Sequence, residues 1–226
     1  MTTASSLHML IEGYRRFRTG PYQAQRRRYD ALALRGQHPQ AMIIACCDSR
    51  VDPTIVFDAA PGELFVLRHI AALVPPCEKD GKHHSASAAI EYAVTQLGIP
   101  NIIVFGHGRC GGIEASLSGC FDGAPECDGG FIHHWMEIIT PARNQVRELA
   151  AAHPDIDARR ALELASIRVS LTNLRSFPFV AEREETGKLQ LHGAYFDIAD
   201  GELRLLDSES GQFKTVDYLE EDLAAA

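Results

Sequence analysis

The chain has 226 residues, of which 46% are hydrophobic, and a formal net charge of -8 at pH 7. An acidic chain gives no electrostatic support to nucleic-acid binding, and no apolar run approaches the about 20 residues of a membrane span. We therefore expect neither kind of partner. The first residues of the chain lack the features of a signal peptide. Six cysteines without a secretory segment indicate a reducing compartment, so we expect a cytoplasmic protein.

Positive charge is concentrated at the amino-terminal end. Residues 1–40 hold seven arginines against two acidic residues, a net charge of +5, so the rest of the chain carries -13. Apolar spacing predicts helices over residues 7–35, broken at Gly20-Pro21. We expect residues 1–36 to form a helical arm that packs on its own body or on a second subunit. Residues 37–226 are expected to form one domain.

The rest of the chain alternates predicted strands and helices. Apolar runs of strand length occupy residues 41–46, 64–67 and 102–106. Helices are expected from Pro53, from an N-cap at Ser85 to Leu97, around 113–117, over 131–151 and over 158–173, before a hairpin of residues 189–196 and 202–206. Strands that alternate with helices imply right-handed crossovers and parallel pairing. We expect an α/β fold: a central, mostly parallel β-sheet flanked by helices, with an N-terminal helical arm and a C-terminal hairpin.

Cysteine and histidine side chains follow two of these strands. Cys46 ends the strand 41–46, and His107 and Cys110 come just after the strand 102–106. If the two strands are neighbours in a parallel sheet, their carboxyl ends lie about 5 Å apart and the three side chains converge. Two thiolates and one imidazole are zinc ligands, and three protein ligands leave the fourth position open, as in catalytic sites. A single cysteine at a strand end is more often a core residue, so the prediction depends on all three.

Charged and glycine residues beside these ligands fit chemistry at an open position. Asp48 can accept a hydrogen bond from a metal-bound hydroxide if it is ionised, and Arg50 favours the ionised form. An ordinary salt bridge in a loop would give the same pair. The backbone N–H groups of Gly111 and Gly112 begin a helix and favour an anion beside the metal.

The segments Cys46–Arg50 (Cys-x-Asp-Ser-Arg) and His107–Gly112 (His-x-x-Cys-Gly-Gly) resemble the signatures of the β-class carbonic anhydrases. Segments between roughly residues 35 and 206 are also similar to this family: Pro61–Phe65, Ala88–Tyr92, Ser170–Leu174 and Leu191–Tyr195. The resemblance implies reversible hydration of carbon dioxide to bicarbonate and a proton by a zinc-bound hydroxide.

The resemblance also implies the roles of individual residues. One zinc per chain would be held by Cys46, His107 and Cys110. Asp48 would occupy the fourth position in an inactive form and pair with Arg50 in the active form.

The chain is most similar to the plant-type branch of the family. That likeness implies a substrate pocket lined by Gln37, Phe65, Ile70 and Tyr92, with the backbone amide of Gly111 beside the zinc. Gln37 would come from a partner subunit, so the expected unit is a homodimer, with a tetramer or octamer left open.

Three positions depart from what the family usually carries. Cys47 stands where serine is usual, and His69 stands where asparagine is usual. Ile43 replaces the tryptophan of a bicarbonate-inhibited site found in another branch, so we do not expect that site. No histidine is singled out as a proton shuttle.

Two other functions remain open on the sequence. The same scaffold could hydrolyse carbonyl sulfide or carbon disulfide, since gas specificity depends on access to the pocket. A zinc-stabilised scaffold protein without activity is the second alternative, against which the Asp48–Arg50 pair argues.

Cysteine and histidine residues elsewhere do not predict a second zinc. Cys77, Cys120 and Cys127 have no His or Cys at ligand spacing. The pairs His83-His84 and His133-His134 are expected at the surface or an interface, because adjacent side chains on a helix or strand face different ways.

Overall fold

The computed structural model describes residues 3–78, 84–120 and 130–216. Its strands form one sheet in the order β2-β1-β3-β4-β5-β6. The strands are β1 (Ala41–Cys46), β2 (Leu64–His69), β3 (Asn101–His107), β4 (Gln190–Phe196), β5 (Leu203–Leu206) and β6 (Phe213–Thr215). The pairs β1–β2, β1–β3 and β3–β4 are parallel, and β5 and β6 add antiparallel pairs. The predicted α/β class and the pairing of the two ligand-bearing strands are confirmed.

Helices surround this sheet. The α-helices are α1 (Thr3–Thr19), α2 (Pro21–Ala24), α3 (Arg26–Arg35), α4 (Pro53–Val56), α5 (Ser85–Glu91), α6 (Gly111–Ser118), α7 (Phe131–Met136), α8 (Thr140–Ala152), α9 (Ala158–Leu174) and α10 (Pro178–Glu185). Shorter turns are η1 (Ile70–Ala72), η4 (Glu137–Ile139) and the π-helix η2 (Tyr92–Gln96). No helix of these described ranges is long and apolar enough to cross a membrane.

The buried side chains alternate between the two faces of the central strands. Met42 and Ile44 of β1 pack in one cluster with residues of α5, α9 and α10, whereas Ile43 and Ala45 pack in another with Phe105. A strand buried on both faces must be apolar at successive positions, which explains the continuous runs in the sequence.

Helix α9 lies directly against β3 beside the predicted metal ligands. A Cβ atom on Gly106 would lie 2.7 Å from Cδ1 of Ile167, and one on Gly193 would lie 3.0 Å from Cγ2 of the same side chain. Only glycine permits this close approach. The two glycines therefore bring α9 within reach of the loop after β3.

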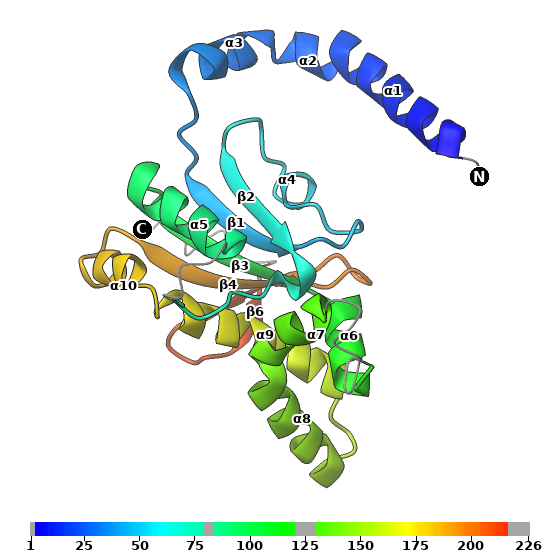
Figure 1. The fold of residues 1–226 in the computed structure, drawn as a ribbon, viewed down its shortest axis with the longest axis vertical. Helices are drawn as coiled ribbons and strands as arrows, with labels where there is room; N and C mark the ends of the chain where they lie inside the picture. The colour runs from blue at the N-terminus through cyan, green and yellow to red at the C-terminus, as the bar shows by residue number, and fades with distance from the viewer. Residues whose placement is uncertain (1–2, 79–83, 121–129, 217–226) are drawn as a thin grey trace.

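The N-terminal arm, α1 to α3, reaches away from the sheet (Figure 1). Its contacts with its own body are at α3, where Arg28 Nη2 lies 2.8 Å from Glu63 Oε1 and Leu32 packs on Gly62. Apolar side chains on α1 are exposed, with Leu7 at 61% and Leu10 at 66%. The arm is thus tied to the body at one end and leaves an apolar face uncovered.

Some local predictions were wrong. Ser85 is the first residue of α5 rather than its N-cap, and the N-cap residue His84 makes no capping hydrogen bond with its side chain. The predicted helix 131–151 is divided into α7, η4 and α8, because Pro141 near the start of α8 has no N–H to continue the ladder. The glycine-rich segment that the sequence carries from Gly119 to Gly130 lies mostly outside the described residues.

Candidate metal centre

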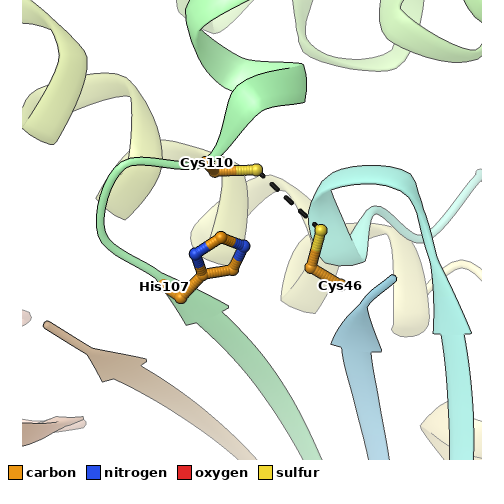
Figure 2. A group of neighbouring side chains, drawn as sticks. All are labelled: Cys46, His107 and Cys110. Atoms are coloured by element: carbon orange, nitrogen blue, oxygen red, sulfur yellow. Dashed lines mark hydrogen bonds between the residues drawn. The ribbon is translucent and has the colours of Figure 1, made fainter. Parts of the chain in front are cut away.

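The three predicted ligands converge at the carboxyl ends of β1 and β3 (Figure 2). Cys46 ends β1, His107 is the last residue of β3, and Cys110 immediately precedes α6. All three residues are buried, and their ligand atoms lie within 4.8 Å of one another. The structure therefore brings together side chains that are 64 residues apart in the chain.

The geometry of the three residues fits a tetrahedral zinc ion. The Cys46 and Cys110 Sγ atoms lie 4.0 Å apart, close to the about 3.8 Å expected for two thiolates on one zinc with Zn–S bonds of about 2.3 Å. His107 Nδ1 lies 2.9 Å from the carbonyl oxygen of Gly108, so Nδ1 carries the proton. Its buried Nε2 has no hydrogen-bond partner in the described part of the chain and offers its lone pair to a metal.

One proton is shared between the two thiols, which shifts their pKa values in opposite directions. The hydrogen bond with Cys110 lowers the pKa of Cys46, and the backbone amides of Asp48 and Ala71 act in the same direction. The same shared proton raises the pKa of Cys110, although the amides of Gly112 and Ile113 oppose this. A divalent cation between the sulfurs replaces the shared proton and favours both thiolates.

Asp48 and Arg50 form a two-point ion pair at the edge of the centre. Arg50 Nη2 lies 2.7 Å from Asp48 Oδ2, and Nε lies 2.9 Å from Oδ1. These bonds hold the pKa of the Asp48 carboxyl well below its usual range. Asp48 Oδ2 is 3.9 Å from His107 Nε2. An ionised carboxylate thus faces the space that the ligands enclose.

Arg68 of β2 holds the loop that carries Cys46 and Asp48, a role that the sequence analysis missed. Its guanidinium donates to the carbonyl oxygens of Cys46 at 2.9 Å, Asp48 at 2.7 Å and Val51 at 2.9 Å. It also lies 2.9 Å from the Asp52 carboxylate. A planar donor group with five N–H bonds suits this task.

Glu163 of α9 holds the second ligand loop and was also missed. The side chain is buried, with the residue 3% exposed, and it accepts hydrogen bonds from the Cys110 amide at 3.1 Å and the Tyr195 hydroxyl at 2.9 Å. Burial raises the pKa of Glu163, and these two donors oppose that rise. A Cβ on Gly108 would lie 2.9 Å from the same hydroxyl, so glycine there keeps the network compact.

Three residues near the centre have left-handed backbone conformations without being glycine. Arg109, between the ligands, has φ 57°, and Ala71, next to the Cys46 sulfur, has φ 58°. Ala72, which follows Ala71, has φ 53°. In the loop after β3 the left-handed position falls on Arg109 rather than on the neighbouring Gly108. Such strain persists only where surrounding bonds hold it, and the Arg109 carbonyl accepts a bond of 2.9 Å from Arg50.

The predicted substrate-pocket residues lie in two places. Phe65 and Tyr92 are in ring contact, with centroids 6.1 Å apart, and Ile70 packs against Gly112 at the start of α6. Gln37 is exposed and precedes β1. Because the ligands lie at the other end of this six-residue strand, about 20 Å away, Gln37 does not reach the centre of its own chain.

Two of the three departures from the family pattern, Cys47 and His69, lie beside the centre. Cys47 is exposed. His69 lies opposite Cys46 in the β1–β2 register, and its ring is 5.1 Å from that of Trp135. Neither buried ring nitrogen has a hydrogen-bond partner among the described residues, and burial lowers the pKa of His69 to about 4.

His133 and His134 lie at the surface, as expected, with side-chain exposures of 31% and 60%. Both rings approach Glu137, and these three residues form a second group with metal-ligand chemistry. Cys77 is partly buried and Cys120 is exposed, whereas His83 and Cys127 lie outside the described residues.

Comparison with known proteins agrees with this geometry. A family model described as carbonic anhydrase matches residues 41–203. The chain is 37% identical over 210 residues to beta carbonic anhydrase 3 of Arabidopsis thaliana, covering 93% of this chain and 79% of that protein.

Solved structures give the same result. The β-carbonic anhydrase CcaA matches with a TM-score of 0.84 and 30% identity, over 93% of this chain and 92% of that one. A tetrameric β-carbonic anhydrase of Sordaria macrospora matches with a TM-score of 0.76 and 27% identity, over 93% and 99% of the two chains. With the Cys-His-Cys centre at the expected sheet edge, these matches confirm the resemblance: the chain belongs to the β-carbonic anhydrase family.

Proposed function

We propose that the protein catalyses the reversible hydration of carbon dioxide to bicarbonate and a proton at the Cys46–His107–Cys110 centre. The observation that carries this proposal is the ligand set itself. Two buried sulfurs and an unpaired imidazole nitrogen surround one point, and the Asp48 carboxylate lies beside it, 3.9 Å from that nitrogen. A zinc ion with three protein ligands supplies a Lewis acid that lowers the pKa of a bound water.

The Asp48–Arg50 pair would orient the attacking water. An ionised carboxylate acts only as a hydrogen-bond acceptor, and the two bonds from Arg50 keep Asp48 in that form at neutral pH. Asp48 then holds a proton of the water and directs an oxygen lone pair toward the carbon of the substrate. Paired in this way with Arg50, the Asp48 carboxylate would not itself act as a metal ligand.

The pocket would bind an apolar gas and release an anion. Phe65, Ile70 and Tyr92 present apolar surface on which carbon dioxide can rest. The Gly111 amide begins α6 and would donate to an oxygen as negative charge develops. These assignments rest on the family pattern together with the positions described above.

A homodimer would complete this pocket. Gln37 lies at the far end of β1 in its own chain, so a partner subunit must supply the corresponding amide. The exposed apolar face of α1 and the exposed Ile70 (39%) and Tyr92 (48%) are surfaces that a partner would cover. One related structure is described as tetrameric, and assembly of this kind is consistent with the arm.

Stopped-flow measurement of carbon dioxide hydration tests the proposal. The zinc-loaded protein is expected to accelerate hydration, and activity should disappear with a chelator and return with one equivalent of zinc per chain. Carbonyl sulfide serves as the competing substrate. A loaded protein that hydrates neither gas, or that turns over carbonyl sulfide in preference, would contradict the assignment.

A further inference from the structure

A second group of potential metal ligands lies on α7 and the turn that follows it. His133, His134 and Glu137 each offer one ligand atom, and these atoms lie within 4.8 Å of one another. The group is more exposed than the catalytic centre, with side-chain exposures of 31%, 60% and 56%. Imidazole nitrogens with a carboxylate oxygen are a donor set that zinc and similar transition metals bind.

The spacing along the helix explains why adjacent histidines reach one carboxylate. α7 ends at Met136, and a 3₁₀ turn begins at Glu137. Residues three and four apart are neighbours on an α-helix, and in a 3₁₀ turn the side chain at i+3 lies directly over that at i. Glu137 stands at i+4 from His133 and at i+3 from His134, so its carboxylate lies over both rings.

The distances in this group suit chelation better than hydrogen bonding alone. His133 Nε2 lies 3.6 Å from Glu137 Oε1, and His134 Nδ1 lies 3.1 Å from Oε2. Two ligands on a tetrahedral zinc, with bonds of about 2.05 Å, are separated by about 3.3 Å. The first distance is too long for a hydrogen bond, and the two distances lie on either side of the chelating separation.

We propose that His133, His134 and Glu137 form a second, exchangeable binding site for a transition-metal dication of the zinc class, with water completing its coordination. The site uses residues separate from the catalytic ligands. Its exposure predicts weaker binding than at the buried centre, because water competes for both the ion and the ligands.

Trp135 connects this site with the substrate pocket and provides a signal. Its indole N–H donates to the Ile70 carbonyl at 2.9 Å, and its ring lies beside His69. It is also the single tryptophan of the chain. A paramagnetic ion bound by His134 and Glu137 would lie close to Trp135 and should quench its fluorescence.

The test uses the full-length protein with one zinc already bound per chain. Calorimetric titration with further zinc is expected to show one additional site in the wild type. That site should be lost in His134→Ala and in Glu137→Gln, and kept in His153→Ala, which removes an exposed imidazole on α8's C-cap. Tryptophan quenching by copper(II) should follow the same pattern, while the tightly bound zinc and the circular dichroism spectrum stay unchanged.

Two results would overturn the proposal. One is the absence of a second binding event in the wild type. The other is a second event, or saturable quenching, of wild-type size in both His134→Ala and Glu137→Gln. Because neither readout depends on turnover, the result stands whether or not the protein hydrates carbon dioxide.

Discussion

Replacing Arg68 tests whether metal binding depends on a side chain that contacts none of the metal-binding atoms. Arg68→Ala removes four hydrogen bonds to the loop from Cys46 to Asp52. At about 1 kcal/mol each, these bonds stabilise the ordered loop by about 4 kcal/mol. Arg68→Lys keeps the charge but presents a compact donor that can satisfy one or two of the four acceptors, so about half of that stabilisation should remain.

Zinc transfer to a chromogenic chelator measures the consequence directly. Loss of a residue that holds a metal ligand typically weakens binding or activity by about 10- to 100-fold. We expect zinc release to accelerate by about this factor in Arg68→Ala and by less in Arg68→Lys, with carbon dioxide hydration falling in the same order. The matched control is Arg175→Ala, which breaks a two-point pair with Glu184 elsewhere on the surface.

Urea unfolding of the same variants measures their overall stability, so that a local loosening of the ligand loop can be told from a general loss of stability. If Arg68→Ala releases zinc at the wild-type rate, or if Arg175→Ala releases it equally fast, Arg68 does not position the ligand loop. An intermediate rate for Arg68→Lys would support the count of hydrogen bonds given above.

The remaining predictions concern the ligands, Asp48 and His69. Replacing Cys46, His107 or Cys110 by Ala should abolish zinc binding and hydration together, and a variant that keeps one zinc per chain by metal analysis would remove that residue from the ligand set. Asp48→Ala should keep zinc but lose most turnover in stopped flow; unchanged turnover from pH 7 to 9 would defeat its assigned role. Burial lowers the pKa of His69 to about 4 in the folded protein. Below about pH 6.5 the imidazole of the unfolded chain is protonated while that of the folded chain is not, so the free energy of unfolding falls with pH until about pH 4. Between pH 7 and 5 the loss from this group is about 2 kcal/mol, and His69→Asn should remove it in urea unfolding; equal slopes for both proteins would refute the calculation.

The sequence predicts those parts of the fold that have a strong local pattern. Strand β1 is continuously apolar from Ala41 to Cys46, and its predicted bounds agree with the structure. Strand β6 was missed because it has three residues, of which Phe213 alone is apolar. The first strand of the expected hairpin, β4, pairs in parallel with β3, and β5 and β6 add two antiparallel strands at that edge.

The candidate site was predictable to the same extent. His107 and Cys110 stand three apart in one segment, and Cys46 was placed beside them by assuming that two buried strands are neighbours. Arg68 and Glu163 carried no such signal, because an arginine after a strand or a glutamate within a helix is ordinary. Their roles depend on the tertiary contacts that bring β2 and α9 to the ligand loops.

The separation of the ligands along the chain has a consequence for unfolding. A metal that joins Cys46 to Cys110 closes a loop of 64 residues, as a disulfide would. In the chain-entropy description, closing a loop of this length restricts the unfolded ensemble by about 4 kcal/mol. The loop contains all of β2, α5 and β3, so a bound ion would act as a cross-link between β1 and the loop after β3. Loss of the metal would therefore remove this cross-link and change how cooperatively the sheet unfolds.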